Sequence, residues 1–280
     1  MTTRFPFLES LVRRSTATGL LALSLSCVPA QMARAEAVDT ELLLLVDIST
    51  PGLTPGNFDK LISGYASAFS STEVLDSIQS GATGKIAVAM MFFGNAGTQE
   101  TAVPWMSISN ASDAAQFASY LTDLSRPFSF GASEPGLALA AATQMFGLET
   151  GAAENGFDSA TQIIEIAATG TANTLGGSTA RDNALASGVD LINAISVGAL
   201  AGITENYYAQ NVIGSEIEGV AATSGTSSTN KNTLTTSLMS VMAASTTTGA
   251  TISVTAVPEP QAPLLFASAL GLGLLFRRRA

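Results

Sequence analysis

The chain has 280 residues, of which 46% are hydrophobic, and it carries 22 acidic against 12 basic side chains. It contains no histidine and one cysteine, which excludes Ser-His-Asp and Cys-His catalysis and removes the usual zinc ligands. An acidic chain of this kind is not suited to bind nucleic acid or an anionic membrane surface. A bound metal would have to be a hard ion with oxygen ligands, such as Mg²⁺, Ca²⁺ or Mn²⁺.

The N-terminal residues have the pattern of a secretory signal peptide. An apolar stretch at 19–28 follows a pair of arginines, and the small residues of a cleavage site, Ala33 and Ala35, come after it. We expect residues 1–35 to be removed on export, together with the single cysteine. The paired arginines leave open whether the general or the twin-arginine route is used.

The body of the chain alternates apolar runs with segments of helical spacing. Runs that predict strands lie at 41–48, 85–93, 102–106, 161–168 and 189–197. Segments that predict helices lie at 58–69, 74–78, 113–124, 134–146, 178–187 and 205–212. We expect Asn110 or Ser112 to cap the third helix and Gly188 to end the fifth. The alternation predicts an α/β fold, a doubly wound and mostly parallel sheet with helices on both faces.

The composition changes beyond the last of these helices. Residues 221–232 are rich in Ser, Thr and Gly and predict a loop or a flexible segment. Residues 234–242 have the spacing of one more helix, and 246–255 are either a strand or a linker. We therefore expect a folded domain at 36–220 and a Ser/Thr-rich tail at 221–256.

Residues 257–280 combine a helix breaker, an apolar run and a basic end. The triplet Pro258-Glu259-Pro260 interrupts any preceding structure, because proline lacks an N–H and fixes φ. The apolar run at 262–276 is shorter than the roughly 20 residues of an ordinary membrane span. Three arginines that favour the cytoplasmic side of a membrane close the chain: Arg277, Arg278 and Arg279.

This order of parts resembles the PEP-CTERM sorting signal. The resemblance implies that an exosortase-type enzyme recognises the Pro-Glu-Pro triplet and that the apolar helix lies in the membrane before processing. An ordinary C-terminal membrane anchor is the alternative. Without both terminal signals, five basic and twenty acidic residues remain, a net charge of −15. This charge favours a basic partner or cations over anionic ones, and the alternative is that it only keeps the protein soluble.

Polar residues follow the first apolar run directly, in the segment Val46-Asp47-Ile48-Ser49. This segment and others in consistent order resemble a von Willebrand factor A-like domain of the bacterial DUF1194 family. The matching segments lie at 38–42, 46–49, 64–69, 84–88, 103–105, 207–208 and 211–214. The resemblance implies the same α/β fold, with a ligand site at the carboxyl ends of the strands.

The von Willebrand factor A fold normally carries a metal-ion-dependent adhesion site, in which oxygen ligands from three loops hold Mg²⁺. The resemblance implies that Asp47 and Ser49 stand in the first loop. It implies Ser133 in the second loop, where the family pattern has threonine.

The chain also departs from that pattern. Pro51 stands at the position of a second serine, and Thr169 stands at the position of the third-loop aspartate. Glu134, next to Ser133, is the candidate acid that would compensate. A site of this kind would hold Mg²⁺ or Ca²⁺ weakly, since charge is needed to replace the ion's hydration water. The alternative is that Asp47 and its neighbours only cap the following turn.

Two functions fit these observations. The first is a non-enzymatic, adhesion-type interaction module, exported to the cell envelope or extracellular matrix, that binds an unknown protein or exopolysaccharide. Its contacts would come from the loops at 47–56, 127–135 and 169–177. The second is a divalent-metal-dependent ligand-binding protein that uses the degraded site. An enzyme with paired carboxylates is a third possibility, but the sequence shows no such pair.

Overall fold

The computed structural model describes residues 35–50, 52–127, 131–147, 155–170, 176–198, 201–222 and 224–227. No helix within these ranges is long and apolar enough to span a membrane. The expected signal peptide, the segments at 234–242 and 246–255, and the sorting signal at 257–280 lie outside the described residues and stay predictions.

The core of the fold is a mixed, mostly parallel sheet with the strand order β4-β3-β2-β6-β7-β8, and β9 also pairs with β7. Four strands form its parallel centre: β2 (Thr40–Asp47), β3 (Ile86–Phe93), β6 (Gln162–Ala168) and β7 (Leu191–Val197). The other strands of this sheet are β4 (Glu100–Ile108), β8 (Gly214–Ser215) and β9 (Ser224–Ser227). A separate two-stranded parallel sheet consists of β1 (Glu36–Val38) and β5 (Phe157–Ser159).

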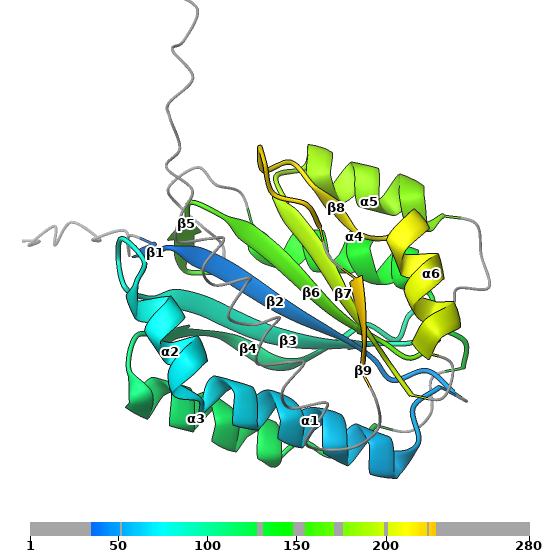
Figure 1. Ribbon diagram of the computed structural model, residues 1–280, viewed down its shortest axis with the longest axis horizontal. Coiled ribbons are helices and arrows are strands. Elements are labelled where there is room, and N and C mark those ends of the chain that lie inside the picture. The colour runs from blue at the N-terminus through cyan, green and yellow to red at the C-terminus, as the bar shows by residue number, and fades with distance from the viewer. Residues whose placement is uncertain are drawn as a thin grey trace, which may run out of the picture. The chain divides into compact units, whose positions relative to one another are not determined.

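Helices cover both faces of the main sheet, as Figure 1 shows. The first face is covered by α1 (Pro55–Phe69), α2 (Thr72–Gln79) and α3 (Ala111–Thr122). The second face is covered by α4 (Pro135–Phe146), α5 (Gly177–Ala186) and α6 (Ala201–Asn211). Successive side chains of β2 enter opposite cores, which explains why this strand is a continuous apolar run rather than an alternating one. The predicted doubly wound α/β fold is confirmed.

Local signals explain where several helices begin and end. Asn110, rather than Ser112, caps α3, because its side chain accepts the backbone N–H groups of Ser112 and Asp113. Gly188 follows α5 with φ = 110°, a left-handed conformation that glycine adopts without strain. Both capping expectations are therefore met.

Two element predictions need correction. The strand expected at 102–106 is longer, Glu100–Ile108, and it pairs antiparallel with β3 through register shifts. The loop expected at 221–232 is wrong for Ser224–Ser227, which forms β9 parallel to β7. Ladder pairing uses backbone groups, so a Ser/Thr/Gly composition does not prevent a short strand beside an open sheet edge.

Candidate functional site

Parallel pairing brings three polar residues to one end of the sheet. Asp47 is the last residue of β2, and Thr169 directly follows β6, the strand beside it. Ser133 directly precedes Glu134, the N-cap residue of α4. We call this end of the sheet, where β2, β3, β6 and β7 finish, the carboxyl edge. In open α/β sheets such an edge is where ligands bind.

The carboxylate of Asp47 is completely buried. Its Oδ1 accepts the backbone N–H of Ser49 at 2.9 Å, and its Oδ2 accepts the backbone N–H of Thr169 at 3.2 Å. The Thr169 hydroxyl in turn donates to the backbone carbonyl of Asp47 at 3.4 Å. The backbone N–H of residue 169 thus donates to the Asp47 carboxylate, and the threonine side chain adds no charge, whereas an aspartate side chain there would add a second negative charge.

Ser49 and Ser133 flank this carboxylate and are both buried. A methyl group placed on Gly170 would lie 3.8 Å from the Oγ of Ser49 and 3.7 Å from the Cβ of Ser133. Both serine side chains therefore lie next to Gly170. The structure brings Asp47, Ser49 and Ser133 together, as the sequence predicts.

Burial has the largest effect on the acidity of Asp47 and raises its pKa above the usual carboxyl range. Hydrogen bonds from Ser49 and Thr169, together with the nearby hydroxyl of Ser133, lower the pKa, but they do not offset the burial. Asp47 is therefore an acid held out of water by neutral donors.

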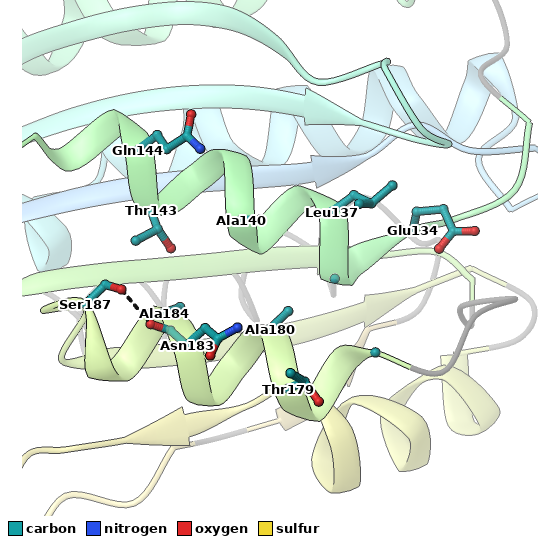
Figure 2. Close-up of a pocket in the computed structure, with 12 residues that line it drawn as sticks. Glu134, Leu137, Ala140, Thr143, Gln144, Thr179, Ala180, Asn183, Ala184 and Ser187 are labelled. Carbon is teal, nitrogen blue, oxygen red and sulfur yellow. Dashed lines mark hydrogen bonds between the residues drawn. The ribbon is translucent and has the colours of Figure 1, made fainter.

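Glu134 has a different environment. It is the N-cap residue of α4 and makes no capping hydrogen bond with its side chain. It lines a groove of about 630 Å³ between α4 and α5, and Figure 2 shows it at the N-terminal end of α4. Burial, and then the charge of Glu134, raise the pKa of Tyr207. The groups that act on Asp47 are hydroxyls and N–H groups, and Glu134 is not among them.

Tyr208 is a member of this site that sequence reasoning missed. It lies on α6, is completely buried, and packs in the second core. Burial, followed by the negative charge of Asp47, raises the pKa of its hydroxyl, whereas the nearby hydroxyl of Ser133 lowers it. Two sequence signals pointed to it: the spacing of Thr204, Tyr208 and Val212, which puts buried residues on one helical face, and the family resemblance of the segment at 207–208.

The oxygen atoms of this site do not form a set of ligands that fits a divalent ion. Asp47 is the one acid at its centre, and both of its oxygens already accept backbone N–H groups. Within the described ranges, no group of three or more His, Cys, Asp or Glu side chains is placed to hold a metal ion. A 2+ ion would leave uncompensated positive charge in a buried space, and Mg²⁺ gives up its water only for charged ligands.

Comparisons with known proteins agree with this architecture. Two structures of proximal thread matrix protein 1 from the mussel byssus match at TM-score 0.51, with 18% and 19% identity. Each match covers 75% of this chain, and it covers 49% and 48% of the mussel protein, so the chain spans about half of that protein's length. A von Willebrand factor type A structure from Catenulispora acidiphila matches at TM-score 0.41 and 13% identity, over 76% of this chain and 43% of that one.

These identities support the fold alone, and the lower TM-score supports no argument. No curated protein sequence matches the chain. The family described as "Protein of unknown function (DUF1194)" matches residues 37–243, a range that includes every strand of the main sheet and all six helices. The chain therefore belongs to the DUF1194 family.

Proposed function

We propose that this protein is an exported interaction module, not an enzyme, which binds its partner through the carboxyl edge without a divalent ion. The observation that carries the proposal is the hydrogen bonding of Asp47 to Ser49 and Thr169, because it joins the loops after β2 and β6. A surface that is already ordered loses little conformational entropy on binding.

Further contacts order the same edge. The N–H of Thr50 donates to the carbonyl of Gly131 at 2.8 Å, and the guanidinium of Arg126 donates to the carbonyl of Ile48 at 3.1 Å. A methyl group on Gly52 would lie 2.6 Å from the carbonyl oxygen of Thr169, so the first and third loops touch. These contacts thus join the described residues of the loops after β2 and β6 and of the segment before α4.

The chemistry of the edge favours binding over catalysis. General acid–base catalysis requires a titratable group within reach of a substrate, and Asp47 is completely buried. Histidine, the commonest such group, is absent from the sequence. The similarity to a byssus matrix protein is a similarity of fold, and fold alone does not establish function. It is compatible with a role in an extracellular matrix.

The proposal includes delivery by the two terminal signals. The protein would reach the cell envelope or the extracellular matrix, with an exosortase-type enzyme acting at Pro258-Glu259-Pro260. The apolar segment at 262–276 would hold it in the membrane before processing. The excess of acidic residues favours a basic or neutral partner, either a protein or an exopolysaccharide.

Two lysine substitutions at the carboxyl edge test this proposal. Gly56 and Ala96 are exposed there, and a side chain at Gly56 would meet nothing within 4 Å. We expect Gly56→Lys and Ala96→Lys to weaken binding to the cell-wall and matrix fraction of the producing cells by about tenfold or more, equivalent to about 1.4 kcal/mol. Binding should not change when EDTA is added.

The matched control is Ala160→Lys, which places the same charge on an exposed residue at the opposite edge, before β6. It should bind as the unmodified protein does. Equal losses at both edges would mean that the added charge, and not the site, matters. Unchanged binding by both edge variants would refute the assignment of the carboxyl edge.

A further inference from the structure

A groove of about 580 Å³ lies at the outer edge of the main sheet, between β4 and α3, which are neighbours in the fold (Figure 1). Five consecutive residues of β4, 102–106, line one wall, and residues of α3 and its C-terminal end line the other. The β4 residues pair with the middle of β3, so this groove is distinct from the carboxyl edge. We call it the α3–β4 groove. Its size suits a small ligand.

The strand at this edge is poorly suited to pair with a further strand. β4 ends the strand order, and no described strand pairs with its outer side. Pro104 and Trp105 together face the single residue Ala89, which makes a β-bulge, and a second register shift lies at 90–91 of β3. Proline has no N–H to donate, and bulges twist an edge away from regular pairing. Contacts with a ligand are therefore expected from individual side chains rather than from an added peptide strand.

Rings provide the apolar contacts of the groove. Tyr120 is 48% exposed on α3, and Pro104 is exposed on β4. The Trp105 ring is held in place, because its Nε1–H donates to the carbonyl of Met145 at 2.9 Å and its centroid lies 5.5 Å from that of Phe146. Rings that are exposed or already fixed can pack on a flat apolar face at little cost in conformational entropy.

Polar groups of α3 lie beside the Tyr120 ring. Gln116, Tyr120 and Asp123 follow one another at spacings of four and three residues, so they share one face of the helix. The Nε2 of Gln116 lies 3.5 Å from the hydroxyl of Tyr120, and Gln116 and Asp123 are both exposed. An amide, a hydroxyl and a carboxylate supply donors and acceptors for a ligand with several hydroxyl groups. Among the described residues that line the groove, Asp123 is the one that carries a charge.

We propose that the α3–β4 groove binds a neutral oligosaccharide. A pyranose ring has an apolar face of C–H groups, which packs on a ring such as that of Tyr120. Its hydroxyl groups both donate and accept hydrogen bonds, and Gln116 and Asp123 supply the matching groups. A saccharide with uronate or sulfate groups would be repelled by Asp123 and by the excess of acidic residues in the chain.

A second hollow adjoins the groove and extends this surface. It measures about 290 Å³, shares Pro104 and Trp105 with the groove, and adds the exposed side chains of Thr101 and Gln144. The two hollows together suit a ligand of several linked sugar units better than a single sugar. The inference goes beyond the proposed function, because it assigns a ligand class to a site apart from the carboxyl edge.

Trp105 is the single tryptophan of the chain and reports on binding at this site. The full chain is titrated with neutral β-linked hexasaccharides of glucose, N-acetylglucosamine, galactose and mannose, and with a hexamer of galacturonic acid. We expect a saturable change in tryptophan emission with at least one neutral probe and none with the anionic probe. No saturable change with any neutral hexasaccharide, or tighter binding of the anionic one, would overturn the inference.

Substitutions at Tyr120 then locate the bound saccharide. Tyr120→Ala removes the exposed ring and should weaken binding about tenfold or more, whereas Tyr120→Phe keeps the ring and should stay within about threefold. The matched control is Ile203→Ala, which shortens another exposed apolar side chain, on α6, and should bind as the unmodified protein does. Unchanged binding by Tyr120→Ala, or an equal loss with Ile203→Ala, would mean that the groove is not the site. Gly56→Lys should leave saccharide binding unchanged, so this inference and the proposed function can fail separately.

Discussion

The two ends of strand β2 both carry buried acids, but the protein satisfies them differently. At the amino end, Asp39 accepts three backbone N–H groups, from Thr83 at 2.8 Å, Gly84 at 2.9 Å and Lys85 at 3.3 Å. Glu41, two residues on, accepts hydrogen bonds from the side chains of Asn155 and Ser159. Each of these donors comes from the protein itself, and the acids fix the turn at 81–85 and the residues around β5.

At the carboxyl end, Asp47 accepts two backbone N–H groups, and the nearby hydroxyls of Ser49 and Ser133 lower its pKa against the larger effect of burial. The acids at the amino end fix local turns, whereas Asp47 joins the loops that follow two neighbouring strands, β2 and β6.

Removal of Asp39 should have the largest effect on stability. Asp39→Ala leaves three N–H groups of the turn at 83–85 without their acceptor, and we expect a loss of about 3 kcal/mol at roughly 1 kcal/mol for each bond. Urea unfolding monitored by circular dichroism measures it. Asp158→Ala, the same change at an exposed residue, should stay within about 0.5 kcal/mol of the unmodified protein. A loss below about 1 kcal/mol at Asp39 would mean that water replaces the carboxylate.

Much of the scaffold could be predicted from the sequence because its signals are local. The continuous apolar runs at 41–48 and 85–93 correspond to β2 and β3, since strands covered on both faces need no polar positions. Asp47 and Ser49 could be predicted as edge residues because they directly follow such a run. These inferences depend only on neighbours in the chain.

The features that could not be predicted from the sequence depend on contacts between segments that are distant in the chain. Tyr208 reaches Ser133 only because α6 packs over β7, and no local pattern distinguishes it from an ordinary core tyrosine. Glu134 is adjacent to Ser133 in sequence, yet α4 directs it to the groove, since successive residues at a helix start point in different directions. β9 was missed because its pairing partner is the edge of a sheet that exists only after folding.

At the carboxyl end, the pH dependence of stability should reveal the buried acid. The raised pKa of Asp47 means that the folded protein binds its proton more tightly than the unfolded chain does. Stability contributed by this proton is fully present below the ordinary carboxyl pKa and is lost as pH rises through the raised value. The slope in that window is at most about 1.4 kcal/mol per pH unit for one group.

Asp47→Asn removes this titration while it keeps the shape of the side chain. The stability of the unmodified protein relative to Asp47→Asn should therefore increase as pH falls through the raised pKa of Asp47 toward the ordinary carboxyl range, when both are unfolded in urea at matched ionic strength. Parallel pH profiles would show that Asp47 does not hold its proton more tightly in the folded state. The two ends of β2 would then be more alike than we describe.

Divalent ions should have the smallest effect on the stability of the unmodified protein. This effect tests directly whether the carboxyl end of β2 differs from the amino end. An ion that bound the folded state with a dissociation constant of about 1 mM would stabilise it by about 1.4 kcal/mol at roughly 10 mM. We expect no such increase in melting temperature with Mg²⁺, Ca²⁺ or Mn²⁺, because both carboxylate oxygens of Asp47 already accept backbone N–H groups, from Ser49 and Thr169. Asp47→Ala separates specific from general ion effects, since a shift seen in both proteins reflects the acidic surface as a whole. A shift that only the unmodified protein shows would mean that Asp47 holds an ion, and that the carboxyl edge binds a metal despite its single central acid.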